Sequence, residues 1–436
     1  SLSIPLMRIL KHDEANFERK AAKIFKRRAI PTDDLRVSVE KIISMVRSDG
    51  DKALSTLTQK YDGASISSND LLVKRKEINK ANDSVCGQVK EAVDMAQSNV
   101  KGFAIRGLRK NWEMKNAQGA KVGEVFLPFS RVGVYVPGGS APLVSTSIMT
   151  VAIAEAAGVE EIVVCTPPNR EGEINSELLY AIKSSGATEI YKVGGAQAIA
   201  AMSVGTKSIG QVEKIFGPGN SFVVEAKRQL FGTVAVDLLP GPSEIFVLAD
   251  SSGRADWIAS DLLAQAEHGG DSQIAFATTS IKLLEKVKTE LKSQAKILNR
   301  RKQISEVIKS GTSLVLLKSI KQGIDLANDF APEHLSLIVR NKDEVIPKLK
   351  TCGAIFIGSY SPVSVGDFLA GPSHTLPTGG AGKSFPGLTA DMFQRRTSII
   401  ELDKKSLKKS IPAVEIFAKI EGLDAHGNSA KIRGAE

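Results

Sequence analysis

The sequence predicts an α/β protein that contains two α/β domains, the second inserted into the first, with helical arms at both ends. The chain of 436 residues is longer than one ordinary domain, so two or three compact units are expected. From Arg131 onward, short apolar segments alternate with glycine-rich turns and helical patterns, in two successive sets. This alternation is typical of a parallel sheet covered by helices.

The N-terminal part is expected to be helical. A charged helix over 14–28 should end before Pro31. Thr32 is a typical N-cap, and the apolar residues that follow at helical spacing predict a helix that stops at Gly50. Two more helices are predicted near 52–61 and 77–105.

The apolar segments after residue 130 predict two groups of strands. The first group covers 132–136, 161–165, 190–193 and 214–216, and the second covers 245–249, 273–278, 314–317, 336–339 and 354–357. Helices are expected between them, at 145–157, from Gln197 to Ala201, and at 225–230, 254–268 and 281–293. After Pro386 the pattern breaks, and a helix near 411–420 closes the chain. The predicted units are an N-terminal arm (1–31), a first α/β domain (32–134 with 243–388), an inserted α/β domain (135–242) and a C-terminal segment (389–436).

Composition restricts the class of protein. The 42% hydrophobic and 24% charged residues are typical of a soluble globular protein, and no apolar run of about 18 residues is present, which excludes a membrane span. The first 20 residues lack the pattern of a secretory signal, so a cytoplasmic or organellar location is expected. The net charge of +10 admits an anionic partner, but the charges are interleaved and aromatic residues are few, which argues against nucleic acid. Cys86, Cys165 and Cys352 make no metal-spaced pair.

Histidine gives the sharpest sign of chemistry, because there are only five. Gln265 and His268 share a face of the last turn of a predicted helix, where the partial negative charge of the helix end favours a cation. A polar last turn capped by Gly269 is the equally open alternative. His12 stands alone on a charged arm and is expected to be solvated.

Glu333 and His334 precede a predicted strand, so their side chains diverge, and one could handle a substrate proton while the other addresses a water. A polar loop before a strand is the plain alternative. Asp367 and His374 lie in a loop rich in glycine, proline and serine, where binding residues are common. His426 follows the terminal helix, and a tail histidine of this kind is more often solvated.

The glycine-rich turns indicate phosphate contact, because glycine lets the backbone approach a ligand and a helix N-terminus attracts anions. None of them has the G-x-G-x-x-G pattern followed by a ribose-binding acid. Dinucleotide binding is therefore suggested, and an ordinary strand-to-helix turn stays open for each.

Taken together, these segments resemble the histidinol dehydrogenase family from about residue 30 to the C-terminus. The stretches that carry the resemblance are VYVPGGSAP (134–142), GGAQA (194–198), FGPGN (216–220), GPSE (241–244), DLLAQAEH (261–268), APEHL (331–335), SVGD (364–367), HTLPT (374–378) and the spacing of Glu421 and His426. The chain departs from many members at Gly379–Gly382, where they carry a bulkier stretch, and this bears on the shape of the substrate pocket.

The resemblance implies a homodimer whose two nucleotide-fold domains are related to the aldehyde dehydrogenase type, with 135–242 binding NAD and 389–436 forming the dimer. It implies one zinc ion per subunit, which suits nitrogen and oxygen ligands. The implied ligands are Gln265, His268, Asp367 and His426, with His426 and Glu421 reaching over from the other subunit.

The resemblance also implies the chemistry, which is oxidation of L-histidinol to L-histidine through histidinal with two NAD. His334 would be the base and Glu333 would activate water. The residues implied to hold substrate are Ser243, Gln265, His268, His334, Asp367, His374, Glu421 and His426, and those implied to contact NAD are Tyr135, Gln197 and Asn220. Glu421 beside His426 favours a substrate with an imidazole ring.

Two other functions stay open at this point. A relative within the family could oxidise another small alcohol, such as a sulfonated diol, because fold and site fix the substrate only in part. A protein without catalytic activity could instead bind anions on its basic surface.

Overall fold

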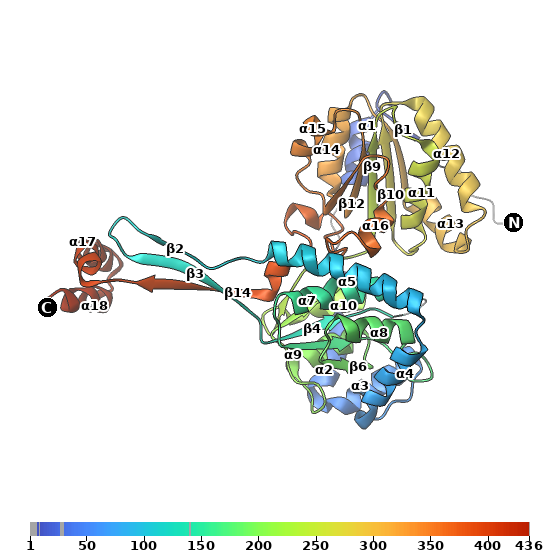
Figure 1. The fold of residues 1–436 in the computed structure, drawn as a ribbon. Coiled ribbons are helices and arrows are strands. Elements are labelled where there is room, and N and C mark those ends of the chain that lie inside the picture. Colours follow the sequence, from blue (N-terminus) through green and yellow to red (C-terminus); the bar gives the residue numbers. More distant parts are fainter. Residues whose placement is uncertain (1–6, 8, 27–29, 139–140, 436) are drawn as a thin grey trace.

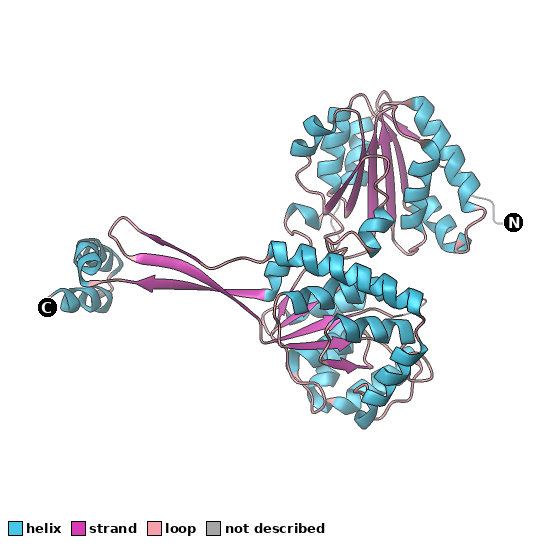
Figure 2. Cartoon of the chain, viewed as in Figure 1, coloured by secondary structure: helices cyan, strands magenta, loops and turns pink. Residues whose placement is uncertain are grey.

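The computed structural model describes residues 7, 9–26, 30–138 and 141–435. Two lobes, each built on a parallel sheet, pack against each other, and a long thin arm leaves one of them and ends in two helices (Figure 1). Figure 2 shows the same view with the strands of each lobe enclosed by helices. The predicted α/β fold with parallel sheets is confirmed. Within the described ranges, no helix is both long and apolar enough to cross a membrane.

The first lobe holds a six-stranded parallel sheet in the order β1-β11-β10-β9-β12-β13. Its strands are β1 (Ile9–Lys11), β9 (Glu244–Ala249), β10 (Gln273–Thr278), β11 (Thr312–Leu316), β12 (His334–Ile338) and β13 (Ala354–Ile357). One face packs on α11 (Ala255–Ala266), α12 (Ile281–Ala295) and α13 (Arg301–Ser310). The other face packs on α1 (Phe17–Phe25), α14 (Ile320–Phe330) and α15 (Lys342–Val345).

The second lobe holds a five-stranded parallel sheet in the order β6-β5-β4-β7-β8. Its strands are β4 (Arg131–Tyr135), β5 (Glu161–Cys165), β6 (Glu189–Tyr191), β7 (Lys214–Phe216) and β8 (Ala235–Val236). One face packs on α2 (Asp33–Asp49), α3 (Asp51–Asp62), α9 (Gly195–Val204) and α10 (Ser221–Leu230). The other face packs on α4 (Arg75–Ser84), α5 (Gly87–Gly107), α6 (Val144–Ser147), α7 (Ile153–Ala156) and α8 (Ser176–Ser185).

This packing corrects the predicted assignment of 32–134 to the same domain as 243–388. The apolar faces of α2 and α5 are buried against the five-stranded sheet, and β4 is one of its central strands. The predicted N-terminal arm also differs, because β1 extends the six-stranded sheet and α1 packs beside α14. The start of that arm (1–6 and 8) and 27–29 lie outside the described residues, as do Gly139, Ser140 and the last residue.

The arm is an antiparallel ribbon of β2 (Trp112–Lys115), β3 (Lys121–Pro128) and β14 (Gln394–Glu401), in the order β14-β3-β2. It ends in α17 (Lys404–Glu421) and α18 (Asp424–Gly434), which pack on each other (Figure 1). The ribbon was not predicted, because β2 and β14 are exposed, β3 is only partly buried, and none of them has the buried apolar run of a core strand.

Most helix limits follow the expected signals. Thr32 caps α2 by accepting a hydrogen bond from the Leu35 backbone, and Gly50 ends that helix. The single helix expected over 77–105 is divided into α4 and α5. The helices α13 and α14, and the short α16 (Val363–Phe368), were not predicted.

Candidate active site

The predicted catalytic residues gather at the amino edge of the six-stranded sheet. Glu333 directly precedes β12, and His334 is the first residue of that strand. The helix α11 runs back against the strands, so its last turn, with Gln265, comes to the same edge. Asp367 is on α16, which follows β13 and packs against α11.

Ala331, which has a strained backbone, sets the direction in which the chain enters Glu333 and His334. Ala331 ends α14 and has a left-handed backbone with φ +49°, which costs about 1–2 kcal/mol for a residue with a side chain. The main chain beyond it is fixed to the start of β13, where Ala354 donates a hydrogen bond to the Glu333 carbonyl at 3.0 Å. Strain of this kind is concentrated at functional sites.

The hydrogen bonds of His334 define which of its nitrogens is basic. Nδ1 lies 3.0 Å from the carbonyl oxygen of Glu244, which can only accept, so Nδ1 carries the hydrogen in the neutral ring. Nε2 is therefore the proton acceptor, and it lies 3.3 Å from Oδ1 of Asp367. The ring is 3% exposed. Burial alone would lower the pKa of His334, but the carboxylates of Glu333 and Asp367 outweigh it and raise the pKa to about 9. Nε2 therefore accepts a substrate proton only after the ring has released its own.

Glu333 is held by a second buried acid, Glu244. The backbone N–H of Glu244 donates to Oε2 of Glu333 at 2.8 Å, and the backbone N–H of Glu333 lies 3.4 Å from Oε1 of Glu244. Burial raises the pKa of Glu333 to about 8. Glu244 also accepts from the Gly379 backbone at 3.2 Å. Glu244 was not predicted as a site residue, although an acid at the start of an apolar strand is the signal that could have indicated it.

His374 connects α16, which carries Asp367, to the second lobe. Its Nδ1 donates to the Asp367 carbonyl at 2.9 Å, so its Nε2 accepts from the Thr146 hydroxyl at 3.1 Å. Burial lowers the pKa of His374 and keeps the ring neutral. Thr146 is a second residue that sequence reasoning missed, since nothing in the sequence pairs α6 with this loop.

The remaining predicted residues divide into two groups. Ser243 directly precedes β9 and lies at the same edge as His334. Glu421 ends α17 and His426 is in the first turn of α18, both exposed. Figure 1 shows these two helices at the far end of the arm, away from both sheets. A single chain therefore does not bring His426 to its own Asp367.

Three donors at this edge fit a metal ion only in part. His268 and Asp367 interact electrostatically. The side chain of Gln265 is buried, and its Nε2 has no hydrogen-bond partner among the described residues. Turning this amide by 180° would present its oxygen instead. Nitrogen and oxygen donors suit zinc, but tetrahedral zinc needs a fourth. Across the described part of the chain, no three His, Cys, Asp or Glu side chains form a metal-binding group by themselves.

A large cavity opens at the carboxyl edge of the five-stranded sheet. It measures about 930 Å³ and is lined by all three residues predicted to contact NAD, Tyr135, Gln197 and Asn220. Each of them follows or ends a strand of this sheet or starts the next helix. The strand order reverses between β4 and β7, which is where nucleotides bind in open parallel sheets.

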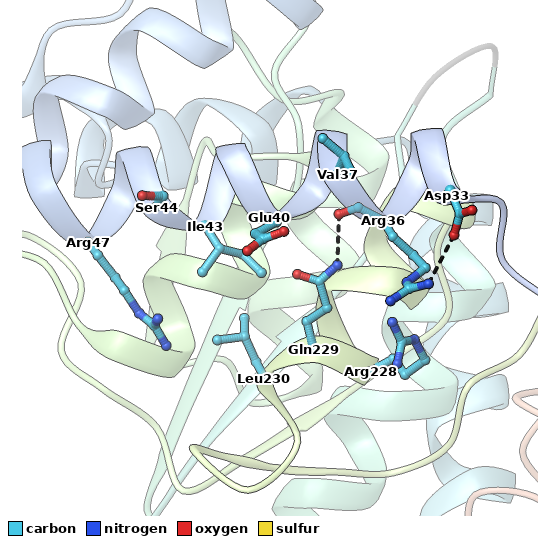
Figure 3. A pocket seen from close by; sticks show the side chains of 10 residues that line it. All are labelled: Asp33, Arg36, Val37, Glu40, Ile43, Ser44, Arg47, Arg228, Gln229 and Leu230. Atoms are coloured by element: carbon cyan, nitrogen blue, oxygen red, sulfur yellow. Dashed lines mark hydrogen bonds and ion pairs between the residues drawn. The ribbon is translucent and has the colours of Figure 1, made fainter.

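A second hollow, of about 590 Å³, lies between α2 and the end of α10 (Figure 3). Arg36 pairs there with Asp33 at 3.0 Å, and the Gln229 amide donates to the Arg36 carbonyl. Arg228 pairs with Glu225. Three arginines and two acids line this hollow, and none of the predicted site residues does.

A parallel sheet with a cavity at its switch point, joined to a lobe that carries a buried acid–imidazole pair, is an arrangement expected of an NAD-dependent oxidoreductase. The family model described as histidinol dehydrogenase matches residues 25–434. The chain belongs to the histidinol dehydrogenase family. It is accordingly an NAD-dependent oxidoreductase of histidine biosynthesis.

Individual relatives agree with the family over nearly the whole chain. Histidinol dehydrogenase of Geobacillus kaustophilus is 39% identical over 92% of this chain and 94% of its own length. That of Caldanaerobacter subterraneus is 41% identical over 94% of this chain and 95% of its own length. The crystal structure of histidinol dehydrogenase from Elizabethkingia anophelis has a TM-score of 0.93 and 34% identity, and it covers 98% of both chains.

Proposed function

We propose that this protein oxidises L-histidinol to L-histidine through histidinal, with two NAD molecules, one zinc ion per subunit and active sites shared within a homodimer. The observation that carries the proposal is the buried His334, whose Nδ1 is bonded to a carbonyl so that Nε2 faces the site as a base. The cytoplasm is the compartment in which we propose that it works.

In the first oxidation, His334 accepts the hydroxyl proton of the alcohol at Nε2 while hydride leaves the carbinol carbon for NAD. The Glu244 carbonyl keeps the ring in the required tautomer, because it can only accept from Nδ1. Burial of the ring excludes water that would compete for the proton.

In the second oxidation, Glu333 takes a proton from a water that adds to the aldehyde. The carboxyl lies beside the ring of His334, with Oε2 of Glu333 3.6 Å from Nδ1, which keeps the two groups in one site. Burial raises the pKa of Glu333, and a carboxylate with a raised pKa is a stronger base than an exposed one. His334 returns the proton of the first step to the aldehyde oxygen as the water adds, and it then accepts a hydroxyl proton of the hydrate as the second hydride leaves.

Gln265, His268, Asp367 and the partner's His426 would hold the zinc ion. When bound, zinc supplies an electrophilic centre that orients the amine and imidazole of the substrate. Ser243, His374 and Glu421 would hold the substrate, and the acid at Glu421 favours a substrate with an imidazole ring. Tyr135, Gln197 and Asn220 would contact NAD.

The exposed apolar surface of the arm supports the proposed homodimer. Large apolar side chains of β14, α17 and α18 are open to solvent, namely Ile400, Ile416, Phe417, Ile420 and Ile432. Monomers rarely expose apolar patches of this kind. A second copy that covers the arm would also bring the missing ligand His426 to Asp367.

The activity is tested by incubating the purified protein with a limiting amount of L-histidinol and an excess of NAD. We expect two NADH for each L-histidinol consumed, with L-histidine as product. A stoichiometry of one NADH, or turnover of a sulfonated diol in preference to histidinol, would favour the alternative relative of the family. No NADH from any alcohol would favour a protein that only binds anions.

The shared site predicts complementation between two inactive variants, His334→Ala and His426→Ala. After random subunit exchange half of the dimers are hybrids, and each hybrid has one intact site of two, so activity should recover to about a quarter of the wild-type value. Activity is measured after exchange has been verified with differently tagged chains. Exchange of a His334→Ala protein with a second His334→Ala protein is the control and should recover nothing. Verified hybrids without activity would mean that each site is built from one chain.

A further inference from the structure

A fully buried ion pair lies in the lobe that holds the cavity of about 930 Å³. Lys227 is on α10, and Asp237 directly follows β8. Both side chains have no exposed area, and Nζ of Lys227 lies 2.5 Å from Oδ1 of Asp237. Neither residue lines the cavity. The pair is therefore outside the machinery described so far.

The two charged groups hold one peptide unit from both sides. The backbone N–H of Gly217 donates to Oδ2 of Asp237 at 2.8 Å, and the Gly217 carbonyl accepts from Nζ of Lys227 at 2.8 Å. Gly217 has φ +110°, and a Cβ there would lie 2.2 Å from the Tyr135 carbonyl oxygen. The pair thus fixes a glycine in a backbone conformation that brings the turn against β4.

This glycine opens the turn that leads to Asn220. The Asn220 side chain caps α10 by accepting from the backbone N–H groups of Phe222 and Val223, both at 3.1 Å. Tyr135, which Gly217 contacts, lines the same cavity as Asn220. Because Lys227 is itself on α10, the pair joins the end of β7, the turn and the following helix.

A buried ion pair is a costly way to gain stability. Its attraction roughly offsets the cost of removing two charges from water, and well-packed apolar residues often do as well. Its benefit lies in directional bonds that select one arrangement of the groups it touches. Here those groups are the N–H and C=O of Gly217.

We propose that Lys227 and Asp237 are positioning residues that preorganise the Gly217–Asn220 turn for NAD. The inference rests on the proposed contact of Asn220 with NAD. Without the pair, the turn samples other conformations, and NAD must select the binding one, which weakens its affinity. The histidinol site lies at the edge of the other sheet and should be unaffected.

The test is the double variant Lys227→Met/Asp237→Leu, which removes both charges of the pair together. We expect KM for NAD and Kd for NADH to rise by about tenfold or more, as they would if the turn held its binding conformation only about a tenth of the time. At saturating NAD, kcat and KM for L-histidinol should stay within about twofold. In the variant Lys227→Gln/Asp237→Asn, amides can still bond Gly217, so the loss of NAD affinity should be smaller.

The matched control removes another ion pair of the same lobe with Arg131→Met/Glu189→Leu. Arg131 and Glu189 lie at the amino ends of β4 and β6, opposite the cavity. This variant should lower the melting temperature without changing Kd for NADH. If both ion-pair variants of Lys227 and Asp237 fold and bind NADH as the wild type does, the positioning role is wrong.

Two further outcomes are decisive. A fall in kcat with unchanged Kd for NADH would also overturn the proposal. If Lys227→Met/Asp237→Leu does not fold, the NADH titration of the folded Lys227→Gln/Asp237→Asn variant is used alone. A raised Kd for NADH in that variant supports the proposal, and a wild-type Kd overturns it. The variant Asn220→Ala separates the premise from the inference, because unchanged NADH affinity in Asn220→Ala would refute the proposed NAD contact itself.

Discussion

Replacement of His334 by asparagine should slow both oxidations by roughly a hundredfold to ten-thousandfold, the usual cost of losing a general base. Asparagine can keep a hydrogen bond to the Glu244 carbonyl, which His334 Nδ1 makes at 3.0 Å. It has no basic nitrogen to replace Nε2. The loss therefore falls on proton transfer rather than on the fold.

Replacement of Glu333 by glutamine should have a different result. The amide can still accept a hydrogen bond from the Glu244 backbone, so the loop before β12 should keep its conformation. It cannot take a proton from water. Oxidation of histidinal should therefore slow far more than hydride transfer from histidinol.

Single-turnover formation of NADH, started separately from histidinol and from histidinal, resolves the two steps. His12→Asn is the control. His12 directly follows β1, the outermost strand of the six-stranded sheet on the side away from β12, so this variant should leave both rates unchanged. If Glu333→Gln slowed both steps equally and His334→Asn spared the alcohol step, the two roles would have to be exchanged.

The buried parallel strands were the part of the fold that the sequence could predict. Strands such as β5, β9 and β10 are continuous apolar runs, because both faces of a parallel sheet are covered by helices. The ribbon of β3 and β14 could not be predicted. In the single chain β14 is exposed and β3 is only partly buried, so neither a continuous buried run nor a clear alternation marks the ribbon.

The assignment of 32–134 failed for a related reason. Helical spacing shows that α2 has an apolar face, with Val39 and Val46 among its buried residues, but spacing does not say which sheet covers that face. Only the packing in three dimensions shows that it rests beside α9 and α10.

The candidate site residues could be proposed from the sequence, but the residues that hold them in place could not. The imidazole of His334 and the acid of Glu333 were indicated by their chemistry. Glu244 and Thr146 act through hydrogen bonds to residues about 90 and 228 positions away, which no local pattern reveals. His426 lies on α18 at the end of the arm, exposed in the single chain, as expected of a histidine in a solvated tail.

Loss of a proposed zinc ligand should remove the metal together with the activity. Mutation of a residue that only supports a metal ligand typically lowers metal affinity by about 10- to 100-fold. Loss of a direct nitrogen ligand in His268→Ala should therefore lower it by about 100-fold or more. We expect elemental analysis after gel filtration to show close to one zinc per chain in the wild type and little in this variant. His334→Asn should keep its zinc while losing activity, which separates the base from the ligands.

The variant His426→Ala makes the stronger prediction. His426 lies on α18, on the arm and away from the edge where Gln265, His268 and Asp367 meet (Figure 1). If the ligands of a single chain held the metal alone, the substitution would not affect binding, and the zinc content would stay at the wild-type value. A metal completed by the partner's arm should be lost as fully as in His268→Ala, because three ligands leave zinc without its fourth protein donor. Wild-type zinc in His426→Ala, with His12→Ala as the matched control, would therefore remove His426 from the ligand set and with it the main reason for a shared site.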